Sequence, residues 1–318
     1  MARRRDPKPR VFVLGAGKVG TALARALRAV GVRTTLRAAR KALPTTLDAD
    51  VVVLAVRDRD IHPLAERMRD ARLVPAHAVV VHAAGALDAE ALAPLRGSCA
   101  GVAQMHPMMS FASRRVTPGL ERGNVHVQGD VIAVARSARL ARLLGMTPRT
   151  IPDLDAVAYH AAAGLVANGA AALAAVGAQL LTRAGVPPGV APKMLGPLLR
   201  SVADNVERLG FPEALTGPVR RGDAGGVEKH LATLKEKLPD AVELYLAAAR
   251  AQLPLARAIG DAPDETFDAV GRVIEAAQKK SDVHGAGPAK RADARASSAS
   301  SPSQRPATRS SSAERNPE

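Results

Sequence analysis

The sequence predicts a doubly wound α/β domain built on a parallel sheet, followed by an all-α domain. Short apolar runs alternate with helical segments as far as residue 150, and the pattern then becomes helical from Ile151-Pro152 onward. The length of 318 residues suits two domains. We expect a disordered basic lead-in over residues 1–9, the α/β domain over 10–150, the helical domain over 151–278 and a disordered Ser/Ala/Arg-rich tail over 279–318.

The expected elements of the α/β domain follow in chain order from short apolar runs and amphipathic segments. The first helix ends at Gly31, a residue type that terminates helices. Strands are predicted at Val11–Leu14, Thr34–Leu36, Val51–Val56, Ala78–His82, Val102–Met105 and Val131–Val134, with helices at Lys18–Val30 and Ile61–Arg69.

The helical domain is expected to begin with a long Ala/Leu segment that stops at Gly185 and Pro187. Asp153, Asp223 and Asp264 suit helix caps or first turns. Helices are predicted at Asp155–Ala184, Val190–Leu209, Gly225–Leu234, Asp240–Leu253 and Asp264–Gln278. Within the first of them, Ala161–Leu181 is mostly Ala and Gly and is interrupted by Asn168 and Gln179, so we expect a buried helix and no membrane span.

The charge and cysteine content narrow the class of protein. The formal net charge is +15, of which residues 1–10 and 279–318 supply +8, and aromatics make up only 2% of the chain. We therefore expect a solvated surface and no specific nucleic-acid or membrane partner, although a role of the basic ends at such a surface stays open. The single Cys99 and the lack of an apolar leader favour the reducing cytoplasm, and no metal-binding spacing occurs.

A glycine motif follows the first predicted strand directly. Gly15-Ala16-Gly17-Lys18-Val19-Gly20 matches GxGxxG between a strand and an Ala-rich helix. In such a motif the first glycine allows a tight turn, the second admits a pyrophosphate, and the third lets the helix pack on the strand. The sequence therefore predicts a Rossmann-type dinucleotide site.

The residues after the second predicted strand select the cofactor. An NAD site would show an acidic residue there, whereas this chain has Arg37, Arg40 and Lys41. Because Arg and Lys pair with phosphate, we predict NADP(H), with Arg40 as the first choice for the 2′-phosphate and Arg37 and Lys41 next. Some of these side chains could equally be solvated loop charges.

The ends of two further predicted strands should line the same ligand. Ala55 and Val56 follow the third strand, and Ala84 and Gly85 follow the fourth, at the sheet edge where open α/β sheets bind ligands. His82 either touches the ligand or is a packed, hydrogen-bonded histidine.

Several stretches resemble known oxidoreductases. The opening Val11–Gly20 resembles the superfamily of 6-phosphogluconate, β-hydroxyacid and prephenate dehydrogenases and pyrroline-carboxylate reductase. A bacterial group within it, which joins a Rossmann-like domain to a helical domain of unknown function (number 2520), is similar over about residues 10–255. The stretches that carry this resemblance are His82–Leu87, His106–Ala112, Tyr159–Ala163 through Asn168, and Leu215–Asp223.

The resemblance also implies candidate catalytic residues. β-Hydroxyacid dehydrogenases carry a Lys and an Asn one turn apart on the first long helix of their second domain. Here Asn168 matches the Asn, but Gly164 stands where the Lys would be, and His160 lies one turn further back on the same face. His160 is therefore a candidate proton donor, unless it is a core histidine and Asn168 a helix-packing residue.

Two loops supply further candidates. His106 precedes Pro107 in an element similar to one near the prephenate dehydrogenase cleft, so it is a candidate catalytic residue, with Ser110 of the same loop as a substrate contact. Thr216 and Arg221 are candidate contacts for an anionic substrate group, although Arg221 could equally pair with Asp223.

We expect an NADP-dependent dehydrogenase or reductase that moves a hydride between NADP(H) and a small carbonyl, imine or hydroxy-acid substrate. A homodimer through the helical domain is also expected. The alternative is an NADP(H)-binding sensor or interaction protein without turnover, which the absence of the usual helix lysine favours.

Overall fold

The computed structural model describes residues 7–285 of the chain. Contacts divide the described residues into two compact units, with the division between Ala203 and Asp204, and we describe each unit separately. The predicted disorder of residues 1–6 and 286–318 falls outside the described residues. The last helix continues to Gly285, past residue 278, at which the sequence predicts that the helical domain ends.

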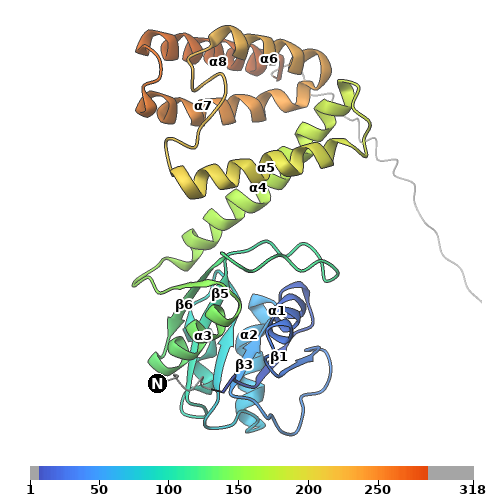
Figure 1. Ribbon diagram of the computed structural model, residues 1–318, viewed down its shortest axis with the longest axis vertical. Helices are drawn as coiled ribbons and strands as arrows, with labels where there is room; N and C mark the ends of the chain where they lie inside the picture. The colour runs from blue at the N-terminus through green and yellow to red at the C-terminus, as the bar shows by residue number, and fades with distance from the viewer. Residues whose placement is uncertain (1–6, 286–318) are drawn as a thin grey trace, which may run out of the picture. The chain divides into compact units, whose positions relative to one another are not determined.

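The first unit is built on a seven-stranded sheet of order β2-β1-β3-β4-β5-β6-β7. Its strands β1, β3, β5 and β6 are labelled in Figure 1. All neighbouring strands are parallel except the antiparallel pair β5 and β6, so the predicted doubly wound class is confirmed. The strands are β1 Val11–Leu14, β2 Thr34–Arg37, β3 Val51–Leu54, β4 Val79–His82, β5 Gly101–Pro107, β6 Asn124–Gly129 and β7 Thr147–Arg149.

Helices cover both faces of the sheet. Val11 and Val13 of β1 pack with Leu23 and Leu140, from the helices α1 and α3, whereas Phe12 and Leu14 point to the opposite face. This second face is covered by the α-helix α2 and the 3-10 helix η1. The bounds are α1 Lys18–Ala29, α2 Asp58–Asp70, η1 Ala89–Leu95 and α3 Val131–Leu143. Buried strands of this kind read as continuous apolar runs, which is why most of them were predictable.

One predicted strand is wrong, and two strands were not predicted. Val131–Val134 forms the first turn of α3, where Val131 and Ile132 are exposed. A short apolar run cannot by itself distinguish a strand from a helix. β6 was missed because His126 and Gln128 interrupt its apolar residues, although His126 is buried.

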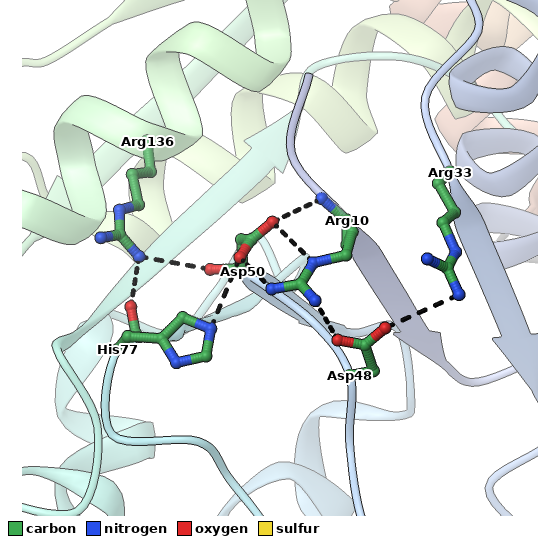
Figure 2. A network of polar contacts seen from close by, with 6 residues as sticks. All are labelled: Arg10, Arg33, Asp48, Asp50, His77 and Arg136. Atoms are coloured by element: carbon green, nitrogen blue, oxygen red, sulfur yellow. Dashed lines mark hydrogen bonds and ion pairs between the residues drawn. The ribbon is translucent and has the colours of Figure 1, made fainter. Parts of the chain in front are cut away.

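A polar network holds Arg10, the residue before β1, at the edge of the sheet where β1 and β3 begin (Figure 2). The guanidinium of Arg10 donates to Asp50, which also accepts from the backbone N–H of Arg10 at 2.7 Å. Asp48 pairs with Arg10 as well, and Arg136 donates to the carbonyl oxygen of His77. The Arg10 guanidinium lowers the pKa of the Asp50 carboxyl to about 2. The network therefore fixes the start of β1 beside the start of β3.

The long helix α4, Ala156–Arg183, follows the sheet in the first unit. Asp155 caps it by accepting from the backbone N–H groups of Val157 and Ala158, so the predicted cap Asp153 is wrong. Asp153 instead lies in a turn with φ of +52°.

The expected burial of this helix is also wrong. None of its residues is buried within the chain, and Leu165 is 77% exposed. Few large side chains project from it to pack on neighbours, because most of its residues are Ala or Gly. By length and composition it is the one helix among residues 7–285 that could cross a membrane.

The second unit is helical. Helix α5, Ala191–Leu209, spans the division between the units, and α6 Ala224–Lys237, η2 Pro239–Ala241, α7 Val242–Ile259 and α8 Asp264–Gly285 follow. Helix α8 packs against both α6 and α7, with Phe267 and Val270 fully buried. Asp223 caps α6 by accepting from the N–H of Gly226, as predicted.

Candidate functional site

A cavity of about 850 Å³ opens at the carboxyl ends of β1, β3, β4 and β5. This is the edge at which open α/β sheets bind their ligands. Among the lining residues are twelve that the sequence singled out: Gly15, Ala16, Gly17, Lys18, Val19, Arg40, Ala55, Val56, Ala84, Gly85, His106 and His160.

The glycine motif has the geometry that a dinucleotide requires. Gly15 has φ of +122°, and a Cβ there would lie 2.2 Å from the carbonyl oxygen of Ala55. A Cβ on Gly20 would lie 1.9 Å from the carbonyl oxygen of Gly15, so this glycine brings α1 against the loop and does not itself line the cavity. Gly17 differs from both because nothing lies within 4 Å of a Cβ built on it. The loop is thus packed on one side and open toward the cavity at Gly17.

The amino end of α1 faces this opening without a protein partner. Gly17 is its N-cap, and no side chain within the described chain caps the helix. The first N–H groups of a helix carry partial positive charge and bind anions such as phosphate. The loop and the helix start therefore form a cradle that fits a pyrophosphate.

The basic residues after β2 separate into one that lines the cavity and two that do not. Arg40 lines it, is exposed, and makes no ion pair with any residue in the described part of the chain. Arg37 donates from Nε to the carbonyl oxygen of Ala42 at 3.0 Å, and Lys41 is exposed outside the cavity. The side chain available to a phosphate here is that of Arg40.

Two histidines converge at the other end of the cavity, beside Gly85. A Cβ on Gly85 would lie 2.4 Å from Nδ1 of His160 and 2.7 Å from Nε2 of His106. The two rings are edge-to-face with centroids 5.9 Å apart. His106 ends β5 and is half-buried, whereas His160 stands on the exposed first turns of α4. The structure thus places both predicted histidines next to Gly85 and close to each other.

His106 is held from behind by Tyr159. The phenol oxygen lies 3.1 Å from Nδ1 of His106, and the two rings meet edge-to-face at 5.4 Å. Burial, together with the charges of the neighbouring His160, His126 and His82, lowers the pKa of His106 to about 4. Burial raises the pKa of Tyr159. At neutral pH the imidazole and the phenol are therefore both uncharged.

A buried amide fixes the backbone beneath these rings. Gln104 donates from Nε2 to the carbonyl oxygen of Ala84 at 2.8 Å, and its Oε1 accepts from Nδ1 of His126. His82 is a packed histidine and does not line the cavity: its Nδ1 accepts from the N–H of Ala84, and its Nε2 donates to the carbonyl oxygen of Asp88. Burial lowers the pKa of His82. Of the two roles left open for His82, the structure supports the structural one.

The remaining predicted site residues lie outside the cavity. Asn168 is exposed on α4, two turns beyond His160, and Ser110 is exposed in the loop after β5. Thr216 and Arg221 belong to the second unit. The neighbouring Arg220 forms an ion pair there with Asp261, at 2.6 Å. The roles of these four residues stay predictions.

The sequence analysis missed part of the cavity wall. Met109, Phe111 and Arg114 line it from the loop that follows His106, and Arg25 of α1 donates to the carbonyl oxygen of Arg114. Asp58 and Asp60 line it from the first turn of α2. The loop carried one usable signal, since its apolar residues directly follow a histidine at the ligand-binding edge of the sheet. Tyr159 had one signal, its place at the start of the stretch Tyr159–Ala163 that carries the family resemblance.

Comparisons with solved structures support the fold. A candidate NADP oxidoreductase from Bacteroides fragilis is 21% identical, with a TM-score of 0.61, over 77% of this chain and 98% of that one. A Thermotoga maritima protein is 24% identical, with a TM-score of 0.56, over 78% and 98% of the two chains. Pyrroline carboxylate reductase from Plasmodium falciparum, solved with NADP bound, is 12% identical, with a TM-score of 0.53, over 77% and 98%.

The comparison with curated proteins found no match. A family model described as Domain of unknown function (DUF2520) matches residues 124–252, from β6 to α7. The chain therefore combines a Rossmann-like α/β sheet with a segment, residues 124–252, that is similar to DUF2520, the domain whose resemblance the sequence motifs carry.

Proposed function

We propose that this protein is an NADP(H)-dependent oxidoreductase. The observation that carries the proposal is the open cradle at Gly17, which joins the uncapped start of α1 to a cavity that ends at His106 and His160. A glycine-rich turn with no ligand would have no need of open space at the middle glycine.

The described residues fit NADP(H) in three places. The glycine loop and the start of α1 would hold the pyrophosphate, and Arg40 would pair with the 2′-phosphate. Ala84 and Gly85 line the cavity beside the histidines, where the flat nicotinamide ring would lie. When bound, the cofactor supplies or accepts the hydride, and the protein supplies orientation and a proton. Two structures of the same fold, the Plasmodium falciparum reductase and an imine reductase from Myxococcus stipitatus, contain NADP or NADP⁺.

Calorimetric titration with NADPH and NADH tests the proposal. We expect NADPH to bind more tightly than NADH, and Arg40→Ala to weaken NADPH binding by about tenfold or more while leaving NADH binding unchanged. Arg67→Ala is the matched control, because Arg67 is exposed on α2 and does not line the cavity. Failure of the wild-type protein to bind either nucleotide would refute the assignment.

A cofactor-binding protein without turnover is the second candidate. It is favoured by Gly164, which stands where β-hydroxyacid dehydrogenases carry their lysine, and by Asn168, which does not line the cavity. This candidate predicts tight NADPH binding together with no substrate-dependent oxidation of NADPH.

We further propose that α4 is covered by a second copy of the chain. The helix has no charged side chain from Ala156 to Thr182, and nothing in the described chain buries any of its residues. A surface without charge suits contact with an identical surface, since like charges cannot meet across it. Light scattering should give twice the chain mass in detergent-free buffer, with the protein recovered from the soluble, cytoplasmic fraction. A monomer, or recovery in membranes, would overturn this assignment.

A further inference from the structure

We propose that the site acts on a carbonyl group, or on the corresponding alcohol, and that the Nε2–H of His106 donates to the substrate oxygen. The inference rests on the proposed NADP(H)-dependent function and narrows its substrate class. The proposal excludes cyclic imines and iminium ions as substrates of this site.

The hydrogen bond to Tyr159 selects the tautomer of His106. Within residues 7–285, the phenol of Tyr159 has no hydrogen-bond partner except Nδ1 of His106. Donation from the phenol to Nδ1 gives the hydroxyl proton an acceptor, whereas the reverse bond would leave that proton without an acceptor among residues 7–285. The proton of the neutral imidazole then resides on Nε2, the atom that faces Gly85 and the cavity. Tyr159 is thus a positioning residue for His106.

A neutral N–H donor suits an oxygen that gains negative charge. During reduction of a carbonyl, its oxygen develops into an alkoxide, which a fixed hydrogen-bond donor stabilises. Neutral histidine can serve as such an electrophile when its pKa is depressed.

The surroundings of His106 do not favour a cationic substrate. The charged groups that act on it are three histidines, His82, His126 and His160, and no carboxylate is among them. Asp58 and Asp60 line the cavity from the first turn of α2, and neither acts on His106. A cationic iminium beside His106 would therefore be next to histidines without a carboxylate that acts on the same residue.

His160 completes the proton balance. The carbonyl carbon receives the hydride, the C=O π bond breaks, and the oxygen takes a proton from the imidazolium form of His160, which is left as neutral imidazole. His106 keeps its own proton throughout. His160 lines the cavity, so it can recover the proton from water there. Alcohol oxidation follows the same steps in reverse.

The tautomer can be measured without any cofactor. Long-range ¹H–¹⁵N spectra of the full chain, labelled at histidine, should show His106 at pH 7 as the neutral Nε2–H form, assigned through His106→Gln. Tyr159→Phe should remove this preference. The matched control is Tyr245→Phe, because Tyr245 lies 3.0 Å from Nδ1 of His230 in the second unit and should change only the His230 signals. An Nδ1–H tautomer of His106 in the wild-type protein would overturn the proposal.

Substrate preference gives the second readout. With NADPH, a panel of ketones and aldehydes should be reduced with kcat/KM at least about tenfold above a panel of five- and six-membered cyclic imines. Tyr159→Phe should lower kcat about tenfold and leave the KM for NADPH unchanged. Faster reduction of the imines, or NADPH binding with no turnover of any compound, would refute the substrate assignment. Absence of NADPH binding would instead contradict the underlying function.

Discussion

A Cβ placed on Gly20 would lie 1.9 Å from the carbonyl oxygen of Gly15, whereas one placed on Gly17 would touch nothing within 4 Å. Two glycines of one motif therefore have separable roles. Gly20 is required by packing within the protein, and Gly17 is required only if a ligand approaches the backbone.

Alanine substitutions should separate these roles. Gly20→Ala should destabilise the protein by about 2 kcal/mol or more, because helix α1 must move away from the loop. Gly17→Ala should leave the melting temperature within about 2 °C and weaken NADPH binding at least about tenfold. Thermal unfolding and calorimetry measure the two effects. Unchanged NADPH affinity in Gly17→Ala would show that no phosphate contacts this loop.

The ion pair of Arg10 with Asp50 should contribute to stability. Asp50→Asn should lower the free energy of unfolding by about 1–3 kcal/mol at pH 7, since it removes a partly buried, charge-assisted contact. Asp48→Asn, at a more exposed partner of Arg10, should cost less than about 1 kcal/mol. Urea denaturation gives both values, and equal losses in the two variants would contradict the ranking.

This pair also predicts acid sensitivity. The pKa of Asp50 falls from an ordinary 3.8 to about 2 in the folded protein. The unfolded chain therefore binds more protons between these values, so the stabilisation is complete above pH 3.8 and is lost as the pH falls toward 2. Asp50→Asn should show a shallower loss of stability in this window. An identical slope in the two proteins would contradict the shift.

Protonation of His106 should produce a second pH range, above that of Asp50, in which the free energy of unfolding depends on pH. Its pKa is about 4 in the folded protein against an ordinary 6.5, so the unfolded chain binds more protons between these values. The free energy of unfolding should decline as the pH falls from about 6.5 to about 4. His106→Gln should flatten part of this decline, with the rest due to His82 and His126, whose pKa values are also lowered. Denaturant unfolding at pH 7, 5.5 and 4.5 checks this, and a wild-type protein equally stable at all three would refute it.

The cap of α4 offers a local test. Asp155→Ala should cost about 1 kcal/mol, because it leaves the N–H groups of Val157 and Ala158 without their acceptor. Asp153→Gly should be neutral or slightly stabilising, since φ of +52° favours glycine. If Asp153→Gly proved the more damaging change, the cap would be assigned to the wrong residue.

Local signals in the sequence were sufficient for the nucleotide cradle and for most of the sheet. The glycine motif, the buried valine strands and Arg40 each depend on neighbours within a few positions. The pair formed by His106 and Tyr159 spans 53 positions and depends on how β5 and α4 meet, so no local pattern contains it. The exposure of α4 was equally hidden, because composition shows that a helix is apolar but not what covers it.

The antiparallel strand β6 has a consequence for how this protein can be divided. The DUF2520 match begins at residue 124, in the first residue of β6, and ends within α7. A recombinant piece cut at these limits would start with β6 paired to β7 alone, and the edge of β6 that pairs with β5 would be left open to pairing with other chains. The limits of the match mark where sequences stay alike, and they are not places at which to cut the gene for expression.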